Sequence, residues 1–299
     1  MIAGVDVASG LVVVDKPAGM TSHDVVGRLR RLLGTRKIGH AGTLDPMATG
    51  VLVLGVQRAT RLLGHLALDT KAYTATIRLG ATTSTDDAEG ELTSSADAAG
   101  LAEDAIRSGM AALTGAIEQV PSSVSAIKVD GRRAYARVRA GERVELPARP
   151  VTVSEFAPLG LRRDGRYTDL DVRVECSSGT YVRALARDLG AGLGVGGHLT
   201  ALRRTRVGPF RIEAARTLDE LALRPELTHG LDSAVATAFR LRAADPEQAA
   251  ALSHGRPLPA EGIPGVYAVA DSQGHALALV SEVDGLAKPV LVLAPAGSG

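Results

Sequence analysis

The chain of 299 residues has one cysteine, no tryptophan and no asparagine. Because Cys176 is alone, no intrachain disulfide can form, and the sequence predicts a protein of the reducing cytoplasm. Only eight residues are aromatic (five Tyr and three Phe), so aliphatic side chains must build the core. No apolar run approaches the roughly 18 residues of a membrane-spanning helix, and the first residues lack the pattern of a secretion signal.

The charge is nearly balanced, with a formal net charge of +1, but its sign is segregated along the chain. Seven basic residues and three acids lie in Lys128–Arg149, whereas seven acids and no base lie in Asp86–Asp104. Such blocks indicate an oriented electric field. Arginine outnumbers lysine 29 to 5, which suits phosphate contacts. A coding bias also explains that excess, so the segregation of charge carries more weight.

The spacing of apolar residues predicts mixed strands and helices without the βαβ rhythm of a doubly wound sheet, which is an α+β fold. The expected strands are 11–14, 73–79, 151–156 and 170–176, and the expected helices are 22–33, 101–113 and 181–189. Ser22 is the expected N-cap of the first helix, and residues 82–98 are expected to form a loop. After about residue 240, glycines punctuate short strand-like runs, which predicts a small all-β domain.

Common cofactor and metal motifs are absent or stand in the wrong context. Gly192–Gly197 matches the letters of a dinucleotide-binding loop, but it follows a predicted helix rather than a strand. The chain has no Walker-type Gly-Lys-Ser/Thr, no His-x-x-x-His and no serine nucleophile elbow. The sequence therefore predicts neither a cofactor nor a metal site.

The most informative stretch is Gly39–Gly50, GHAGTLDPMATG, which leads into the apolar run Val51–Leu54. Its glycines permit a tight turn or a close approach of the backbone to a ligand. Asp45 is the only carboxylate of this loop and follows a basic segment, a setting that suits the delivery of a polyanionic substrate to an acidic catalyst. The alternative is a structural Asp-Pro turn, which is the commoner meaning of that dipeptide.

Three further segments carry candidate site residues, namely Asp15–Ser22, Lys71–Tyr73 and Ser178–Gly190. Tyr181 and Arg183 lie at a strand-to-helix junction, where their side chains can face a common site. An arginine beside Asp45 would keep the carboxylate ionised and lower its pKa by roughly 1–3 units. Tyr73 and Tyr181 could each stack on a base, worth roughly 1–3 kcal/mol. The alternatives for Arg183 are a surface salt bridge with Asp188 or a phosphate contact at the start of the helix, and the alternative for Tyr73 is cross-strand packing.

Taken together, these four segments resemble, in order and spacing, the motifs of the TruB family, the tRNA pseudouridine-55 synthases. The resemblance covers about residues 10–210. Gln119–Lys128 and Gly131–Tyr135 add a fifth match within a predicted RNA-contacting insertion, about residues 119–150. Ser122 and Val124 depart from the usual residues of the family, which affects local RNA contacts rather than the chemistry. The C-terminal residues resemble the family's PUA-type RNA-binding module.

The resemblance implies a pseudouridine synthase fold built on a central, mainly antiparallel sheet, with a catalytic domain over 1–240 and a PUA-like domain over 241–299. It implies an isomerase that needs no cofactor and acts on a uridine in the T-loop of tRNA, position 55. The base flips out, the N1–C1′ bond breaks, the base turns and a C5–C1′ bond forms. The expected partner is the T-arm of tRNA, and the chain is expected to be a cytoplasmic monomer.

The resemblance also assigns roles to single residues. Asp45 stands at the position of the family's nucleophile, and whether it attacks C1′ or C6, or acts through a glycal, stays open. Arg183 is expected to pair with Asp45, while Tyr73 is expected to stack on the uracil and is a candidate proton acceptor. The residues expected to contact the substrate or shape its pocket are His40, Tyr181, Leu202 and Lys16. The basic span Lys128–Arg149 is expected to close on RNA.

Two other function classes remain in view. The first is a non-catalytic RNA-binding protein or tRNA-folding chaperone of the same fold, and the second is a glycosidase that excises the base. Pure binding has no need of a buried carboxylate among phosphate-binding bases, so the set of Asp45, Tyr73 and Arg183 argues against the chaperone. The products distinguish the three classes: an isomer of unchanged mass, no change, or free uracil.

Overall fold

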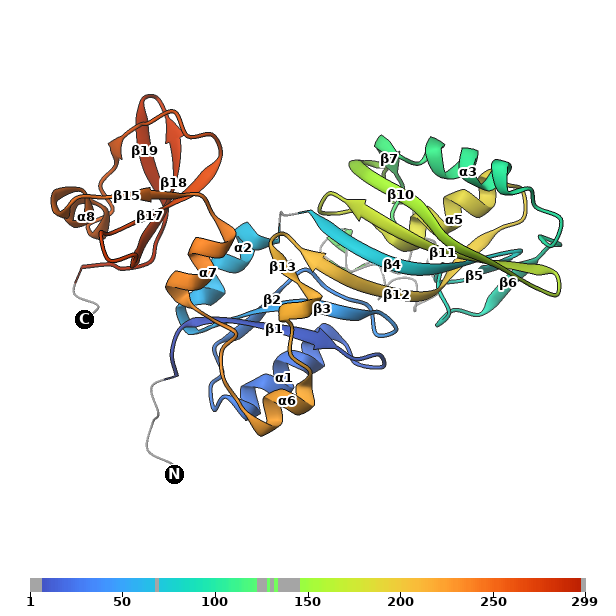
Figure 1. Cartoon of the computed structure of the whole chain (residues 1–299), viewed down its shortest axis with the longest axis horizontal. Coiled ribbons are helices and arrows are strands. Elements are labelled where there is room, and N and C mark those ends of the chain that lie inside the picture. Colours follow the sequence, from blue (N-terminus) through green and yellow to red (C-terminus); the bar gives the residue numbers. More distant parts are fainter. Residues whose placement is uncertain (1–6, 68–69, 123–127, 130–131, 134–145, 297–299) are drawn as a thin grey trace.

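The computed structural model describes residues 7–67, 70–122, 128–129, 132–133 and 146–296 (Figure 1). Much of the predicted insertion over 119–150, and most of its basic span, lies outside these ranges. Within them, no helix is both long enough and apolar enough to pass through a bilayer.

A ten-stranded sheet forms the larger part of the molecule. Its strands are β1 (Gly10–Lys16), β2 (Ile38–Ala41), β3 (Thr49–Val56), β4 (Lys71–Leu79), β7 (Gly115–Gln119), β10 (Arg149–Asp164), β11 (Tyr167–Cys176), β12 (Gly197–Val207), β13 (Phe210–Arg211) and β14 (His229–Gly230). They are ordered β14-β1-β3-β12-β4-β11-β10-β7, with β2 beside β3 and β13 beside β12. Every pair is antiparallel except β3 with β12, so the predicted α+β fold on a mainly antiparallel sheet is confirmed.

The sequence pattern of each strand follows from what covers it. β1 and β3 are buried on both faces and therefore read as continuous apolar runs. In β4, Tyr73, Ala75, Ile77 and Leu79 alternate with more exposed residues, because only one face of this strand is covered by helices. On this half of the sheet the covering helices are α3 (Glu103–Ala112) and α5 (Val182–Gly192), whereas α1 (Ser22–Leu32) and α6 (Leu218–Leu223) pack against the half that holds β1 and β2.

The first helix begins as expected, but its cap differs from the prediction. Thr21, not Ser22, is the N-cap: its hydroxyl accepts a hydrogen bond from the Asp24 amide at 3.1 Å, and the Asp24 carboxylate bonds back to the Thr21 amide. Ser22 is thereby free for a tertiary contact. Its hydroxyl accepts from the Leu44 amide at 2.8 Å and donates to the Leu44 carbonyl at 3.1 Å, which fixes the residue before Asp45.

A separate five-stranded sheet forms the C-terminal part (Figure 1, red). It contains β15 (Leu241–Ala243), β16 (Leu258–Pro259), β17 (Val266–Ala270), β18 (Ala276–Val283) and β19 (Leu286–Val292), and α8 (Pro246–Ser253) packs against it. Leu252, Tyr267 and Val280 belong to a core within this part. The prediction of a β-rich C-terminal domain is confirmed, while its boundary at 240/241 stays a prediction.

The core of this C-terminal part is not entirely separate from the rest of the molecule. Leu279 and Leu291 belong to a cluster that also holds residues from the outer face of β1 and β3, from the 3-10 helix η1 (Gln57–Leu62), and from α2 (Leu63–Leu66) and α7 (Leu231–Ala238). Figure 1 shows α2 and α7 between the two sheets. The pattern of glycines and short strands predicts the C-terminal sheet itself, but it does not show that this sheet packs against the outer face of β1 and β3.

Candidate active site

The site lies where the two halves of the large sheet meet. Only Thr49–Gly50 of β3 pair with Arg203–Arg204 of β12, and the loop that carries Asp45 enters β3 at this junction. Gly50 has a φ of +100°, and a Cβ atom there would lie 2.1 Å from the Arg204 carbonyl oxygen. Glycine is therefore required at the end of the loop, both for its backbone conformation and for the close approach of the two strands.

A pocket of about 290 Å³ opens beside Asp45. The sequence-assigned residues that line it are Asp45, Tyr73, Tyr181, Arg183 and Leu202. They come from four separate elements, namely the loop before β3, the strands β4 and β12, and the start of α5. His40 and Lys16, which were also assigned from the sequence, lie outside this lining.

Arg183 is the central cation of the pocket. Its Nε lies 3.1 Å from Asp45 Oδ2 and its Nη1 lies 3.4 Å from Asp87 Oδ2, with its side chain only 6% exposed. Nη1 also donates to the Thr85 carbonyl at 2.9 Å. The expected ion pair with Asp45 is therefore present, and the alternative pairing with Asp188 is not. The start of α5 explains this placement, because Tyr181 is its N-cap residue and Arg183 lies in its first turn.

Asp87 is a site residue that the sequence did not indicate. Its side chain is 3% exposed and accepts hydrogen bonds from Thr85 Oγ1 at 2.5 Å and from the Glu89 amide at 3.0 Å. The neighbouring Asp86 turns instead toward Arg187. In a segment expected to be a loop, two adjacent aspartates look alike, and only the fold directs one of them into the site. Arg183 consequently bridges two carboxylates.

The expected direction of the Asp45 pKa was wrong. The Asp45 side chain keeps 37% of its surface open to the pocket, yet protein atoms surround the recess and limit its hydration. This burial raises the pKa of Asp45 above its ordinary value, and the nearby Asp87 charge raises it further. The Arg183 guanidinium opposes the shift without overcoming it. The sequence indicates an arginine that can pair with Asp45, but it does not show how strongly the fold desolvates the carboxylate.

The raised pKa predicts a pH dependence. If the ionised carboxylate is the reactive form, the single-turnover rate should fall as the pH is lowered through a pKa above that of an exposed aspartate, about 3.9. The measurement is a pH–rate profile at saturating RNA, with thermal unfolding followed at each pH to separate loss of reactivity from loss of structure. A rate that stays constant down to about pH 4 in the folded protein would contradict the assignment.

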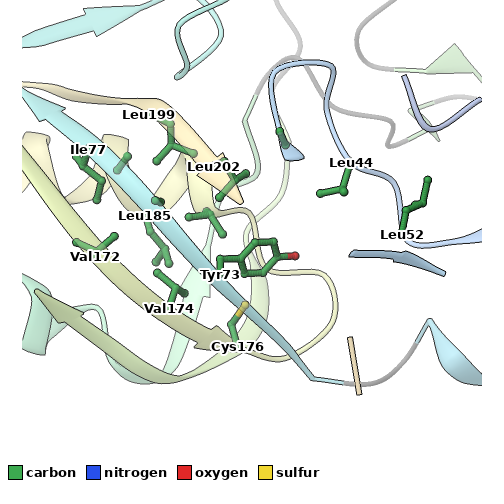
Figure 2. Close-up of a cluster of buried hydrophobic side chains, with 14 of the residues drawn as sticks. Leu44, Leu52, Tyr73, Ile77, Val172, Val174, Cys176, Leu185, Leu199 and Leu202 are labelled. Atoms are coloured by element: carbon green, nitrogen blue, oxygen red, sulfur yellow. The ribbon is translucent and has the colours of Figure 1, made fainter. Parts of the chain in front are cut away.

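Tyr73 forms part of the core as well as of the pocket. Figure 2 shows its ring near Cys176 and Leu202, with the hydroxyl oxygen directed toward the side where Leu44 and Leu52 lie. The residue is 6% exposed, so only a small part of the ring is available to a base. Burial raises the pKa of the Tyr73 hydroxyl, and the Arg204 guanidinium opposes that rise.

Lys16 is fully buried at the end of β1. Its Nζ donates to the carbonyls of Pro17 at 2.8 Å, Met20 at 2.6 Å and Pro46 at 3.2 Å. Because Pro46 follows Asp45, this lysine ties the segment after β1 to the Asp45 loop, and it has no exposed surface for a substrate. Burial lowers the pKa of Lys16 to about 8, with the Asp45 charge opposing the shift.

His40 lies on β2, opposite Leu54 of β3. Burial, and secondarily the charge of Arg204, lowers the pKa of its imidazole, so the neutral form is favoured at pH 7. Its Nδ1 is buried and has no hydrogen-bond partner among the residues that the structure describes.

Two basic residues without an assigned role also line the pocket, Lys71 and Arg204. Strand alternation places Lys71 on the face of Tyr73, and Arg204 on the face of Leu202, which is the only signal in the sequence that could have found them. In the described ranges, no group of three or more His, Cys, Asp or Glu side chains could share a metal ion.

Comparison with known proteins gives the family. Residues 30–182 match the N-terminal domain of "TruB family pseudouridylate synthase". Residues 183–235 match "tRNA pseudouridylate synthase B C-terminal domain", and residues 239–294 match "tRNA Pseudouridine synthase II, C terminal".

Relatives and solved structures agree with this match. The chain is 64% identical to "tRNA pseudouridine synthase B" of Nocardia farcinica (98% of this chain, 96% of that protein) and 57% identical to the protein of that name from Mycobacterium bovis (96% of each). A chain in the "Crystal Structure of a Cbf5-Nop10-Gar1 Complex" superposes with a TM-score of 0.73 at 28% identity, covering 96% of this chain and 85% of that one. The chain therefore belongs to the TruB family of pseudouridylate synthases and is an isomerase.

Proposed function

We propose that the chain isomerises uridine 55 in the T-loop of tRNA to pseudouridine, with Asp45 as the reactive carboxylate. The observation that carries the proposal is the Asp45–Arg183 ion pair, 3.1 Å long, in a pocket lined by Tyr73 and Tyr181. The names of the curated relatives support tRNA as the substrate.

The reaction conserves every atom of the nucleotide. The uracil N1–C1′ bond breaks, the base turns in the pocket, and C5 bonds to C1′. The proton on C5 leaves and N1 gains one, so neither an oxidant nor water is consumed. A carboxylate such as Asp45 can divide this change into easier steps, whether it attacks C1′ or C6 or assists through a glycal. The Arg183 guanidinium favours the ionised form of that carboxylate and so opposes, without overcoming, the rise in its pKa that burial causes.

The target base cannot reach Asp45 while it is stacked in RNA. It has to flip into the pocket, which costs a few kcal/mol, and a preformed loop lowers that cost relative to a duplex. In the proposal, Tyr181 and the exposed part of Tyr73 contact the flipped uracil, and Leu202 closes the apolar side of the pocket. Lys16 holds the loop through its hydrogen bond to the Pro46 carbonyl and shapes the site without reacting, and His40 supports the flipped nucleotide.

The remaining expectations are part of the same proposal. The domain over 241–299 would contact parts of tRNA beyond the T-arm, and the chain would act as a monomer. The basic residues of Lys128–Arg149 would close on the RNA backbone, since arginine-rich segments commonly order on RNA.

Product analysis tests the proposal. A T-arm hairpin with a single uridine at position 55 should yield a nucleoside of unchanged mass and altered chromatographic retention, and a hairpin with cytidine there should yield nothing. Release of free uracil would instead indicate a glycosidase. Tight binding of the hairpin without any product would indicate a chaperone, and either result would overturn the proposal.

A further inference from the structure

Arg204 is the most deeply buried guanidinium of the described chain. It lies on β12, is 1% exposed and is the largest of the fully buried side chains. Among the ion pairs of the described residues, none includes Arg204. A buried charge without a carboxylate partner is costly, and an apolar residue of similar size is often as stable or more stable at such a position. Core filling alone therefore does not account for an arginine here.

The guanidinium N–H groups of Arg204 donate hydrogen bonds to the loop that carries Asp45 and to the strand that follows it. Nη2 donates to the Gly42 carbonyl at 3.1 Å and Nη1 to the Thr43 carbonyl at 3.3 Å. Nε donates to the Val51 carbonyl, beyond the loop, at 2.7 Å. One planar group thus holds the first residues of the loop and the strand after it.

The same guanidinium reaches Tyr73 across the sheet. Arg204 and Tyr73 are directly opposite each other in the β12–β4 ladder, which places both side chains on one face. The Arg204 guanidinium opposes the rise in the pKa of the Tyr73 hydroxyl that burial causes, so the two groups interact. Both residues line the pocket.

We infer that Arg204 is a positioning residue that sets the Asp45 loop and the Tyr73 hydroxyl in register with each other. It does not touch the reacting atoms in this arrangement. It acts by fixing backbone carbonyls three and two residues before Asp45 and by fixing the orientation of the phenol. This inference rests on the proposed role of Asp45, because a loop has to be placed accurately only if it carries a reacting group.

Arg204→Met tests the inference, with Arg203→Met as the matched control. Arg203 is the adjacent arginine, opposite Thr74 in the same ladder, and pairs with Asp15 at 2.7 Å. Single-turnover rates at saturating tRNA, tRNA affinity and thermal unfolding are measured for both. Arg204→Met should lower the rate about 100-fold, as expected for a small misplacement of a reacting group, while the affinity stays within about threefold. Arg203→Met should stay within about threefold in rate.

Two further measurements separate positioning from general weakening of the fold. Tyrosine Cζ labelling should show the Tyr73 resonance shifted in Arg204→Met and unshifted in Leu221→Ala, a cavity variant in the core under α6. Arg204→Lys keeps the charge and some of the donors, so it should recover part of the rate lost in Arg204→Met. If Arg204→Met does not fold, the rate, the affinity and the Tyr73 resonance are measured on Arg204→Lys instead.

Three outcomes would overturn the inference: a wild-type rate in folded Arg204→Met or Arg204→Lys, a loss of affinity as large as the loss of rate, or an unshifted Tyr73 resonance. Asp45→Asn, measured in the same assay, distinguishes a failure of the proposed function from a failure of the positioning role of Arg204. If Asp45→Asn is active, the proposed function fails. If it is inactive while the Arg204 variants are fully active, only the positioning role fails.

Discussion

Asp45→Asn is expected to abolish pseudouridine formation, lowering the single-turnover rate by more than about 10⁴-fold, the order seen when a catalytic unit is removed. The amide keeps the shape of the carboxyl but cannot act as a nucleophile. Affinity for tRNA should stay within about threefold, because Asp45 lines a pocket and a carboxylate makes no favourable contact with the phosphates that supply much of the affinity. Rates from isolated product and affinities from filter binding provide the test.

Asp86→Asn is the control for this substitution. Asp86 lies one residue from Asp87, pairs with Arg187 at 3.4 Å and has a φ of +61°, which asparagine tolerates. Its variant should keep the rate within about threefold. A rate for Asp45→Asn within tenfold of wild type would remove Asp45 from the chemistry.

The same variant makes a prediction about stability. Because the native pKa of Asp45 is raised, the native state binds the proton more tightly than the unfolded chain. Stability therefore declines as the pH rises from the unfolded pKa to the native one, and the ionised carboxylate is destabilising at neutral pH. Asp45→Asn should accordingly unfold at the same temperature as wild type or at a higher one. A lower unfolding temperature would mean that the Arg183 pair outweighs the burial.

Arg183→Lys is expected to lower the rate about 100-fold with tRNA affinity within about threefold. The planar guanidinium contacts Asp45 through Nε and Asp87 through Nη1, whereas a single ammonium cannot reproduce this geometry. Weaker contact with Asp45 also leaves the effect of burial less opposed, so the acid limb of the pH–rate profile should move to higher pH.

Arg187→Lys is the matched control, one helical turn further along α5 and paired with Asp86 and Asp188. It should leave both the rate and the acid limb close to wild type. If Arg183→Lys turned over at the wild-type rate across neutral pH, the ion pair with Asp45 would have no part in the reaction.

Within the catalytic part, local patterns were sufficient for the main elements and for most of the pocket. Alternation along 73–79 predicts a half-buried strand with Tyr73 on its covered face, and that is the face of β4 that reaches the pocket. The junction before 181–189 predicts a helix start that presents Tyr181 and Arg183 together. The glycines around Asp45 predict a tightly shaped loop. The structure gives the reason for one of them, because at Gly50 the strands β3 and β12 approach too closely for a side chain.

Other features depend on the tertiary structure because they are made by residues far apart in sequence. Asp87 enters the site because Arg183, almost a hundred positions away, lies within reach, and nothing in residues 82–98 indicates which acid is chosen. Arg204 reaches the Asp45 loop and Tyr73 only through the pairing of β12 with both β3 and β4.

The sequence by itself determined the chemical groups of this protein: a lone aspartate on a glycine-shaped loop, two tyrosines and an arginine, in an order that identifies a family. The tertiary structure alone decided the state of those groups. The pKa of Asp45 is raised and not lowered, because desolvation depends on every atom packed around the carboxyl, whereas the neighbouring arginine is one charge among them.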